Sequence, residues 1–202
     1  MSRRIIGLTG NIATGKSAVM RLAAERGALT IDADRVVHDL LATDAAIQSV
    51  VVAAFGPGVR RADGGIDRAV LGGIVFGDAD RLRQLEGILH PAVRAEIARR
   101  VQMTDAPVIM IEAIKLLEGP LAALCDQVWV TACARETQLA RLRVCRGLSE
   151  ADAVARIDAQ SPQADKIARA DVVIDTDGLL RETEEQVFAA WTLLGSGEAP
   201  SL

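Results

Sequence analysis

A glycine-rich stretch near the start of the chain carries the residue types that bind phosphate. Its sequence fits the pattern G-x-x-x-x-G-K-[ST]. Glycines let the backbone turn sharply, so several N–H groups can reach the oxygens of one phosphate, and a helix N-terminus adds its positive dipole. Lys16 would supply a point charge for the β- and γ-phosphates, and Ser17 a hydroxyl for Mg²⁺. The predicted nucleoside triphosphate loop consists of Gly10, Asn11, Ile12, Ala13, Thr14, Gly15, Lys16 and Ser17.

The context of this loop favours a ligand site over a simple turn. An apolar run precedes the loop and a helical pattern follows it, as the motif requires. GTPases share the loop, and residues 175–178 superficially match their D-x-x-G box, but this match comes too late in the chain. The Asn-Lys-x-Asp box that reads guanine is impossible, because Asn11 is the only asparagine. A GTPase switch is therefore disfavoured.

Two carboxylates follow the second predicted strand. The run at 28–32 ends at Asp32, and Asp34 comes two residues later. In an open α/β sheet, ligands bind at the carboxyl ends of the strands, so both side chains are expected beside the triphosphate. Asp34 is the predicted catalytic base, which orients an acceptor hydroxyl and takes its proton. Asp32 is a candidate substrate contact that could equally cap the next helix, and His38 could contact substrate or make a structural hydrogen bond.

Arginines gather after the fourth predicted strand. Arg141 and Arg146 lie on a helical pattern that is interrupted at Gly147. A phosphoryl transferase must offset the charge on the transferring group and exclude water, and an arginine-bearing lid does both. We predict this role for Arg141 and Arg146. The alternative is a solvated helix whose arginines pair with Glu136 and Glu150.

Five short apolar runs are predicted to be buried strands. Each is apolar at consecutive positions instead of alternating ones, as in a parallel sheet covered on both faces. Helical patterns lie between them, which is typical of an open, doubly wound α/β fold, here the core of a P-loop kinase. The strands are expected at 5–9, 28–32, 108–112, 128–131 and 172–175, and the clearest helical patterns lie at 17–25, 79–89, 92–101, 137–146, 150–160 and 182–194.

Two long connections interrupt the alternation of strands and helices. Residues 35–105 hold helical patterns and a turn-rich patch at 56–65, which predict an inserted helical subdomain. Residues 138–163 are arginine-rich, and the stretch Ser149–Asp152 fits a capping box that starts a second helix there. We expect one domain with a core (about 1–34, 106–137 and 164–195), a helical acceptor-binding insertion (about 35–105) and a lid (about 138–163).

Composition and charge exclude several classes of function. The chain has 202 residues, half of them hydrophobic, and a net charge of −4 at pH 7. A general nucleic-acid binder would usually be basic, so no nucleic-acid partner is expected. No apolar run approaches the ~20 residues that span a bilayer, and the three cysteines lack metal-ligand spacing. We expect a cytoplasmic protein without a membrane partner, a monomer or weak homo-oligomer that acts on a small molecule.

Several motifs, taken together and in order, resemble those of one kinase family. They are the phosphate loop, Asp32-Ala33-Asp34, 65-GIDRAVL-71 with Phe76, Leu89-His90-Pro91, Gln138, Arg141, 146-RGLSE-150, Gln160, Lys166, and 170-ADVVID-175 with Gly178. This combination resembles the dephospho-CoA kinase family over about residues 4–190. The resemblance implies that ATP phosphorylates the 3′-hydroxyl of the ribose of dephospho-CoA. The products would be CoA and ADP, in the last step of coenzyme A biosynthesis.

The resemblance also implies roles for individual residues. Asp34 matches the family's catalytic carboxylate, which faces the 3′-hydroxyl, and Ala13–Ala18 matches its ATP loop. Arg68 and His90 are expected near the acceptor from the resemblance alone, and either could instead be structural. Lys115 stands where the family usually has proline, so it is either an added phosphate contact or a solvent-facing residue.

The phosphate loop departs from the usual family sequence. Asn11, Ala13 and Thr14 replace Gly, Gly and Ser. Asparagine tolerates a left-handed backbone better than most residues, whereas Ala13 tolerates it poorly, so the local path is expected to differ slightly. Thr176 stands where asparagine is common near the adenine.

Two other hypotheses stay open at this point. One is another small-molecule or nucleotide kinase on the same fold, and the order of the motifs argues against it. The other is a P-loop protein that senses a nucleotide without transferring phosphate. A sensor needs no base oriented toward an acceptor, so Asp34 and the arginines argue against this hypothesis.

Overall fold

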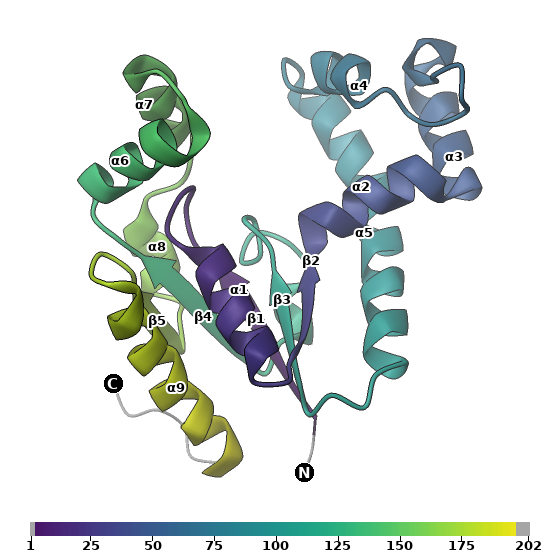
Figure 1. The fold of residues 1–202 in the computed structure, drawn as a ribbon. Coiled ribbons are helices and arrows are strands. Elements are labelled where there is room, and N and C mark those ends of the chain that lie inside the picture. Colours follow the sequence, from purple (N-terminus) through teal and green to yellow (C-terminus); the bar gives the residue numbers. More distant parts are fainter. Residues whose placement is uncertain (1–2, 197–202) are drawn as a thin grey trace. The chain divides into compact units, whose positions relative to one another are not determined.

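The first and largest unit of the fold is built on a five-stranded sheet. The computed structural model describes residues 3–196 of the chain. The strand order is β2-β3-β1-β4-β5, and parallel pairing joins β1 to β3, β1 to β4 and β4 to β5 (Figure 1). Each strand begins and ends within one residue of its predicted position. The strands are β1 (Arg4–Thr9), β2 (Leu29–Asp32), β3 (Val108–Glu112), β4 (Gln127–Ala132) and β5 (Val172–Asp175).

Helices occupy most of the remaining chain, as expected for an α/β fold. Those that belong to the predicted core and lid are α1 (Lys16–Glu25), η2 (Ala122–Leu124), α6 (Arg135–Arg146), α7 (Glu150–Asp158), α8 (Gln163–Ile167) and α9 (Leu180–Ser196). Those in the predicted insertion are α2 (Ala33–Thr43), α3 (Ala45–Phe55), η1 (Pro57–Val59), α4 (Arg68–Val75) and α5 (Ala79–Gln102).

The chain forms two compact units, and the second is inserted into the first. The first unit comprises Met1–Thr30 and Asp105–Leu202, and the second comprises Ile31–Thr104. The phosphate loop belongs to the first unit. Asp34 and the other residues predicted near the acceptor, except Lys115, belong to the second.

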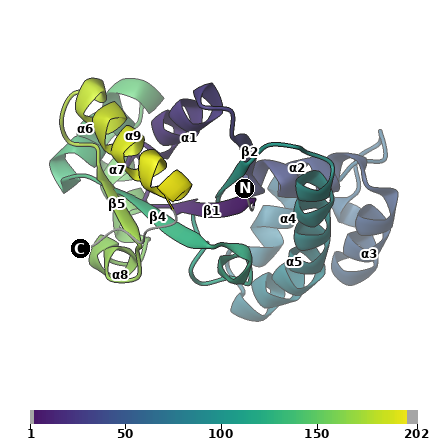
Figure 2. The same cartoon turned by 90° about the horizontal axis from the view of Figure 1, so that it is seen from below.

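The core of the first unit lies between one face of the sheet and helices α1 and α9, which lie on the same side of the strands in Figure 2. Trp129 of β4 is its largest fully buried side chain. Residues of β1, β3, β4 and β5 contribute to this core, and the aliphatic cluster includes Ile6, Leu8, Val108, Met110 and Ile174. Helix α8 packs on β4 and lies on the other side of the strands (Figure 2).

The second unit has a hydrophobic core of its own, made by helices α2 to α5. Aspartate side chains accept hydrogen bonds from the first-turn N–H groups of all four helices, at Asp32, Asp44, Asp67 and Asp78. Such N-caps satisfy donors that lack an intrahelical partner. The buried cluster is Leu41, Val51, Val59, Ile66, Leu71, Val75, Leu85 and Leu89.

Helix α5 corrects the prediction of two separate helical patterns at 79–89 and 92–101. The structure has one helix from Ala79 to Gln102 with Pro91 inside it. A proline in a helix interior removes one backbone hydrogen bond and costs ~3 kcal/mol. The buried side chains offset this cost, because they recur every four residues and form one continuous stripe. They are Leu85, Leu89, Val93 and Ile97.

The helices of residues 3–196 were compared in length and apolar composition with what a bilayer requires; the finding concerns these helices alone. None of these helices is, alone, both long and apolar enough to cross a bilayer. The bent pair formed by α2 and α3 passes the test of length and composition when the two are joined.

Candidate functional site

The phosphate loop connects β1 to α1, and its close contacts require glycine. A Cβ at Gly10 would lie 2.3 Å from the hydroxyl oxygen of Thr131, and Gly10 has a φ of 151°. Gly15 has a φ of 84°, and a Cβ there would lie 3.1 Å from the Thr176 hydroxyl. Both positions therefore exclude other residues for steric reasons, independently of any ligand.

Helix α1 presents an open N-terminus to this loop. No side chain of the described residues caps it, and its N-cap is Gly15 in the left-handed region. No side-chain cap therefore competes with an anion at this end of the helix, where the dipole is positive. The Lys16 side chain is buried, and its ammonium donates to the carbonyls of Gly10 (3.0 Å) and Asn11 (3.1 Å). These contacts hold the charge of Lys16 against the loop.

Ser17 provides the one hydroxyl in the first turn of α1, and it is exposed. No group of three or more His, Cys, Asp or Glu residues in the described chain could hold a metal ion. Mg²⁺ that accompanies a nucleotide takes most of its ligands from phosphate oxygens and water, with one or two from protein. The residues present therefore fit a magnesium ion that arrives with a nucleotide.

Threonine hydroxyls support the loop from beneath. The Thr14 hydroxyl donates to the carbonyl of Asn11 (2.8 Å) and shares a hydrogen bond with Thr131 of β4 (2.7 Å). Thr176, which follows β5, is buried and contacts the Thr14 carbonyl (3.0 Å) through its hydroxyl. Thr176 thus supports the backbone of the phosphate loop.

The two arginines predicted to work in the lid have different surroundings. The guanidinium of Arg141 donates to the carbonyl of Ala13 (3.1 Å) and to the hydroxyl and carbonyl of Thr176. Arg146 is exposed in the last turn of α6, and no hydrogen bond or ion pair of it is found among the described residues. Glu150, one of the partners considered for these arginines, pairs with Arg143 instead.

The two aspartates at the start of α2 are both exposed, and one of them caps the helix. The Asp32 carboxylate accepts from the N–H of Arg35 (3.0 Å) and is the N-cap of α2. Asp32 therefore caps α2, and its contact with a substrate stays a prediction. Asp34 lies in the first turn of α2 and is exposed, so its carboxylate is accessible to solvent and to a substrate.

His38 and Arg68 meet at a pocket within the second unit. An Arg68 guanidinium nitrogen lies 2.9 Å from His38 Nδ1. The pocket has a volume of about 340 Å³ and also contains Arg61 and Asp63, which form an ion pair. The Gly65 N–H and the Arg61 guanidinium lower the pKa of Asp63. Two arginines and one carboxylate give the pocket a net positive charge. Its lining residues are His38, Leu41, Ala42, Arg61, Asp63, Gly65, Ile66 and Arg68.

The remaining predicted residues lie elsewhere. His90 is exposed on α5 and does not line this pocket. Lys115 is exposed in the turn that follows β3. The structure thus brings His38 together with Arg68, and Lys16 together with the loop, but it does not add His90 to the pocket.

Several residues at these sites had no role predicted from the sequence. Arg61 and Asp63 line the pocket at His38 and Arg68, and the only signal in the sequence was the turn-rich patch at 56–65. Gln138 and Gln160 contact the phosphate loop. Both glutamines are among the positions that resemble the kinase family, but the residue type of a glutamine does not predict which backbone group it will contact.

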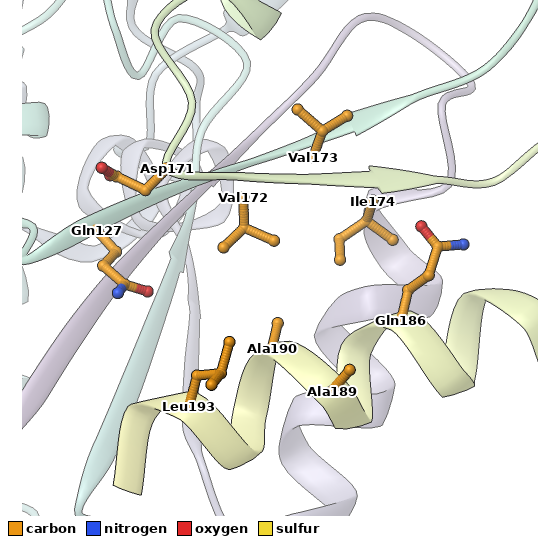
Figure 3. Close-up of a pocket in the computed structure, with 9 residues that line it drawn as sticks. All are labelled: Gln127, Asp171, Val172, Val173, Ile174, Gln186, Ala189, Ala190 and Leu193. Atoms are coloured by element: carbon orange, nitrogen blue, oxygen red, sulfur yellow. The ribbon is translucent and has the colours of Figure 1, made fainter. Parts of the chain in front are cut away.

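A second pocket, of about 290 Å³, lies between β5 and α9 (Figure 3). Val172 and Ile174 of the strand face Ala190 and Leu193 of the helix across it. The amide of Gln186 pairs with both the N–H (2.8 Å) and the carbonyl (2.9 Å) of Asp175. None of the predicted site residues lines this pocket, so it is not part of the candidate site.

Comparison with known proteins identifies the family. The family model for dephospho-CoA kinase matches residues 4–182. The curated dephospho-CoA kinase of Symbiobacterium thermophilum is 47% identical over 198 residues, which cover 96% of this chain and 83% of the relative. The crystal structure of TT1252 from Thermus thermophilus is similar with a TM-score of 0.85 at 29% identity, over 96% of this chain and 98% of that one. For dephospho-CoA kinase from Campylobacter jejuni, the TM-score is 0.70 at 27% identity, with the same coverage. The chain belongs to the dephospho-CoA kinase family.

Proposed function

We propose that the protein transfers the γ-phosphate of ATP to the 3′-hydroxyl of dephospho-CoA, which gives CoA and ADP. The observation that carries this proposal is the phosphate loop with an open helix N-terminus, in a chain that is a family member over most of its length. The loop supports nucleotide binding, and family membership supports the choice of acceptor. A cytoplasmic location and a monomeric or weakly oligomeric state remain predictions from the sequence.

The chemistry assigned to each residue follows from its position in its own unit. In this proposal, the first-turn amides of α1 and the Lys16 ammonium bind the β- and γ-phosphates and stabilise the charge that develops there. Ser17 would hold Mg²⁺, which screens the phosphate charge when it is bound with the nucleotide. The Asp34 carboxylate accepts the proton of the 3′-hydroxyl while the hydroxyl oxygen attacks the γ-phosphorus. The bond to the β-phosphate oxygen breaks, and ADP leaves.

The pocket around His38 and Arg68 is the proposed site for part of the acceptor. Dephospho-CoA carries a diphosphate, and Arg61 and Arg68 supply the planar, permanently charged groups that bind phosphate well. His38 already holds one Arg68 nitrogen, which orients the guanidinium. Asp32 is assigned a structural role in this proposal. Contact of Lys115 and His90 with the substrate remains a prediction from the sequence.

The two lid arginines are assigned different tasks. Arg146 is exposed, so its guanidinium can swing to the transferring phosphoryl group without losing a protein contact found among the described residues. Arg141 would first have to leave the carbonyls of Ala13 and Thr176. We therefore propose Arg146 for charge stabilisation during transfer, and Arg141 for supporting the loop, with direct phosphate contact as a second possible task.

A coupled ADP-release assay with Mg-ATP tests the proposed reaction. The acceptors are dephospho-CoA, a panel of nucleoside monophosphates, adenosine and shikimate, and mass spectrometry checks the product for one added phosphate. Lys16→Ala supplies the background rate. Turnover of dephospho-CoA alone supports the proposal. Turnover of another acceptor instead would identify a kinase with a changed pocket, and ATP binding without any turnover would identify a nucleotide sensor.

A further inference from the structure

Two glutamines hold opposite ends of one residue in the phosphate loop. Gln160 Oε1 accepts a hydrogen bond from the Ile12 N–H (2.6 Å), and Gln138 Nε2 donates one to the Ile12 carbonyl (2.7 Å). Gln138 begins the second turn of α6, and Gln160 follows α7. Because a backbone N–H only donates and a carbonyl only accepts, the two glutamines must present different ends of their amides. We call these two residues the glutamine clamp.

The clamp is reinforced by packing and by a third polar contact. Ile12 and Ala13 pack against the buried side chains of Leu142 and Ile157 from helices α6 and α7. The Asn11 amide donates to the Ser161 carbonyl (3.0 Å). The buried Lys166 ammonium in turn holds the Ser161 hydroxyl (2.8 Å). The outer turn of the loop is therefore built into the predicted lid segment as one packed structure.

We propose that Gln138 and Gln160 are positioning residues that set the backbone of the phosphate loop for ATP. The inference rests on the proposed function of this loop. In a trans peptide the C=O and N–H groups point in opposite directions. Holding the Ile12 carbonyl toward Gln138 therefore turns the Ala13 N–H away from α6. The Ile12 N–H is occupied by Gln160, so the phosphates are bound by the amides that follow it.

This arrangement predicts an effect on ATP binding in particular. A loop that is already held in its binding conformation loses little conformational freedom when the nucleotide arrives. Without the clamp, the same ordering must occur on binding, so affinity for ATP falls. The affinity for the acceptor does not depend on the clamp. A purely structural role would instead lower stability and the active fraction, with no selective change in the KM for ATP.

The two clamp positions respond differently to glutamate, and this gives the test. In Gln160→Glu a carboxylate oxygen still accepts from the Ile12 N–H, whereas in Gln138→Glu an ionised carboxylate has no hydrogen to donate. Gln160→Ala removes the contact with the Ile12 N–H, and Gln138→Ala removes the contact with the Ile12 carbonyl. Gln163→Ala is the matched control, because the Gln163 amide donates to Cys133 and not to the loop. For each variant, the dissociation constant of ATP is measured by calorimetry, together with both KM values, kcat and the melting temperature.

The expected pattern separates the two positions. Gln160→Ala, Gln138→Ala and Gln138→Glu should weaken ATP binding and raise its KM about tenfold, equivalent to ~1.4 kcal/mol, with the KM for dephospho-CoA unchanged. Gln160→Glu and Gln163→Ala should stay near the wild type. The proposal is overturned if Gln160→Ala binds ATP normally, or if Gln160→Glu behaves like Gln160→Ala.

Calorimetry also separates this inference from the proposed reaction. If the wild type does not phosphorylate dephospho-CoA but the variants lose ATP affinity in the expected pattern, the clamp stands and the acceptor assignment fails. If the wild type phosphorylates dephospho-CoA and the variants bind ATP normally, the reaction stands and the clamp fails.

Discussion

Ala13 shows how a single strained residue is held at the phosphate loop. It is the one residue besides glycine with φ in the left-handed region among the described residues, at 60°. This conformation costs ~1–2 kcal/mol for a residue with a Cβ. The carbonyl of Ala13 accepts from Arg141, and its methyl group packs beside Leu142. These contacts keep alanine in a conformation that glycine adopts freely.

Two substitutions at Ala13 should therefore change the melting temperature by different amounts. Ala13→Gly relieves the left-handed strain, but glycine also makes the unfolded chain more flexible, which favours unfolding. The two effects offset each other, so the melting temperature should change by less than about 3 °C. Ala13→Val places a β-branched side chain at a positive φ and should lower the melting temperature by at least ~3 °C and weaken ATP binding. Thermal unfolding and calorimetry check both. A loss of stability in Ala13→Gly that exceeds the loss in Ala13→Val would contradict the assignment of strain.

Asp34→Asn tests the proposed base. The substitution keeps the size of the side chain and removes its ability to take a proton, so kcat should fall by roughly 10²–10⁴ while ATP still binds. Steady-state kinetics and ATP calorimetry measure the two effects. Asp44→Asn is the matched control, because the Asp44 side chain caps α3 and asparagine also caps a helix. An Asp34→Asn protein with a normal kcat would remove Asp34 from the mechanism.

At the scale of the element, α5 shows that burial can override a helix breaker. A pattern broken at His90-Pro91 predicted two helices, yet the apolar stripe on both sides of Pro91 keeps the same spacing. The last turns of α5 also carry a charged cluster. The Glu96 carboxylate accepts from Arg99 (2.7 Å) and Arg100 (2.8 Å). These arginines lower the pKa of Glu96 from near 4.5 to about 2.

The sign of the Glu96 contribution to stability follows from this lowered pKa. The folded state favours the ionised form, so the stabilisation is fully present above the unfolded pKa near 4.5 and is lost as the pH falls toward about 2. Glu96→Gln should lower the free energy of unfolding by ~1 kcal/mol at pH 7, and this difference should shrink between pH 5 and pH 3.

Melting temperatures of the wild type and Glu96→Gln at pH 7, 5, 4 and 3 provide the measurement. Glu25→Gln serves as the control, because Glu25 is an exposed carboxylate of α1 for which no ion pair is found among the described residues. A difference between the wild type and Glu96→Gln that is constant over this pH range would show that ionisation of Glu96 contributes nothing.

At the scale of the whole molecule, the proposed reaction draws on residues from both compact units. The loop and the arginines belong to the first, and Asp34 and the His38–Arg68 pocket to the second. Each unit has its own buried cluster, so each has the packing to hold its share of the site in shape. Within the first unit, the predicted lid segment packs against Ile12 and Ala13 of the phosphate loop.

Mg-ATP should stabilise the whole protein against heat. A ligand at about 100 times its dissociation constant adds ~2.7 kcal/mol to the free energy of unfolding, which corresponds to a rise of about 5–10 °C for a chain of this size. Lys16→Ala should lose most of this rise and keep any shift caused by dephospho-CoA alone. Differential scanning calorimetry measures both, and an equal shift in Lys16→Ala would exclude Lys16 from nucleotide binding.

Local sequence patterns were sufficient to predict the positions of the core strands and of the phosphate loop. The strand predictions succeeded because residues buried on both faces of a parallel sheet are apolar in succession, and this is visible in runs such as 108–112. Ser149 caps α7 as predicted, because a cap depends on neighbours within three residues. Gly147, in the left-handed region, ends α6 for the same local reason.

Contacts between distant residues were decided only by the tertiary structure. Gln160 and Ile12 are 148 residues apart, and Arg68 and His38 are 30 apart. A side chain's type limits what it can bond, but its partner depends on which backbone the fold brings within about 3 Å. The sequence by itself thus determined the phosphate loop, the sheet and the family. The tertiary structure was needed to find the clamp on Ile12, the hydrogen bond between Thr176 and the loop, and the pocket at Arg68. Their residues come within hydrogen-bond distance only in the folded chain, and the spacing of residues along the sequence does not show which ones meet.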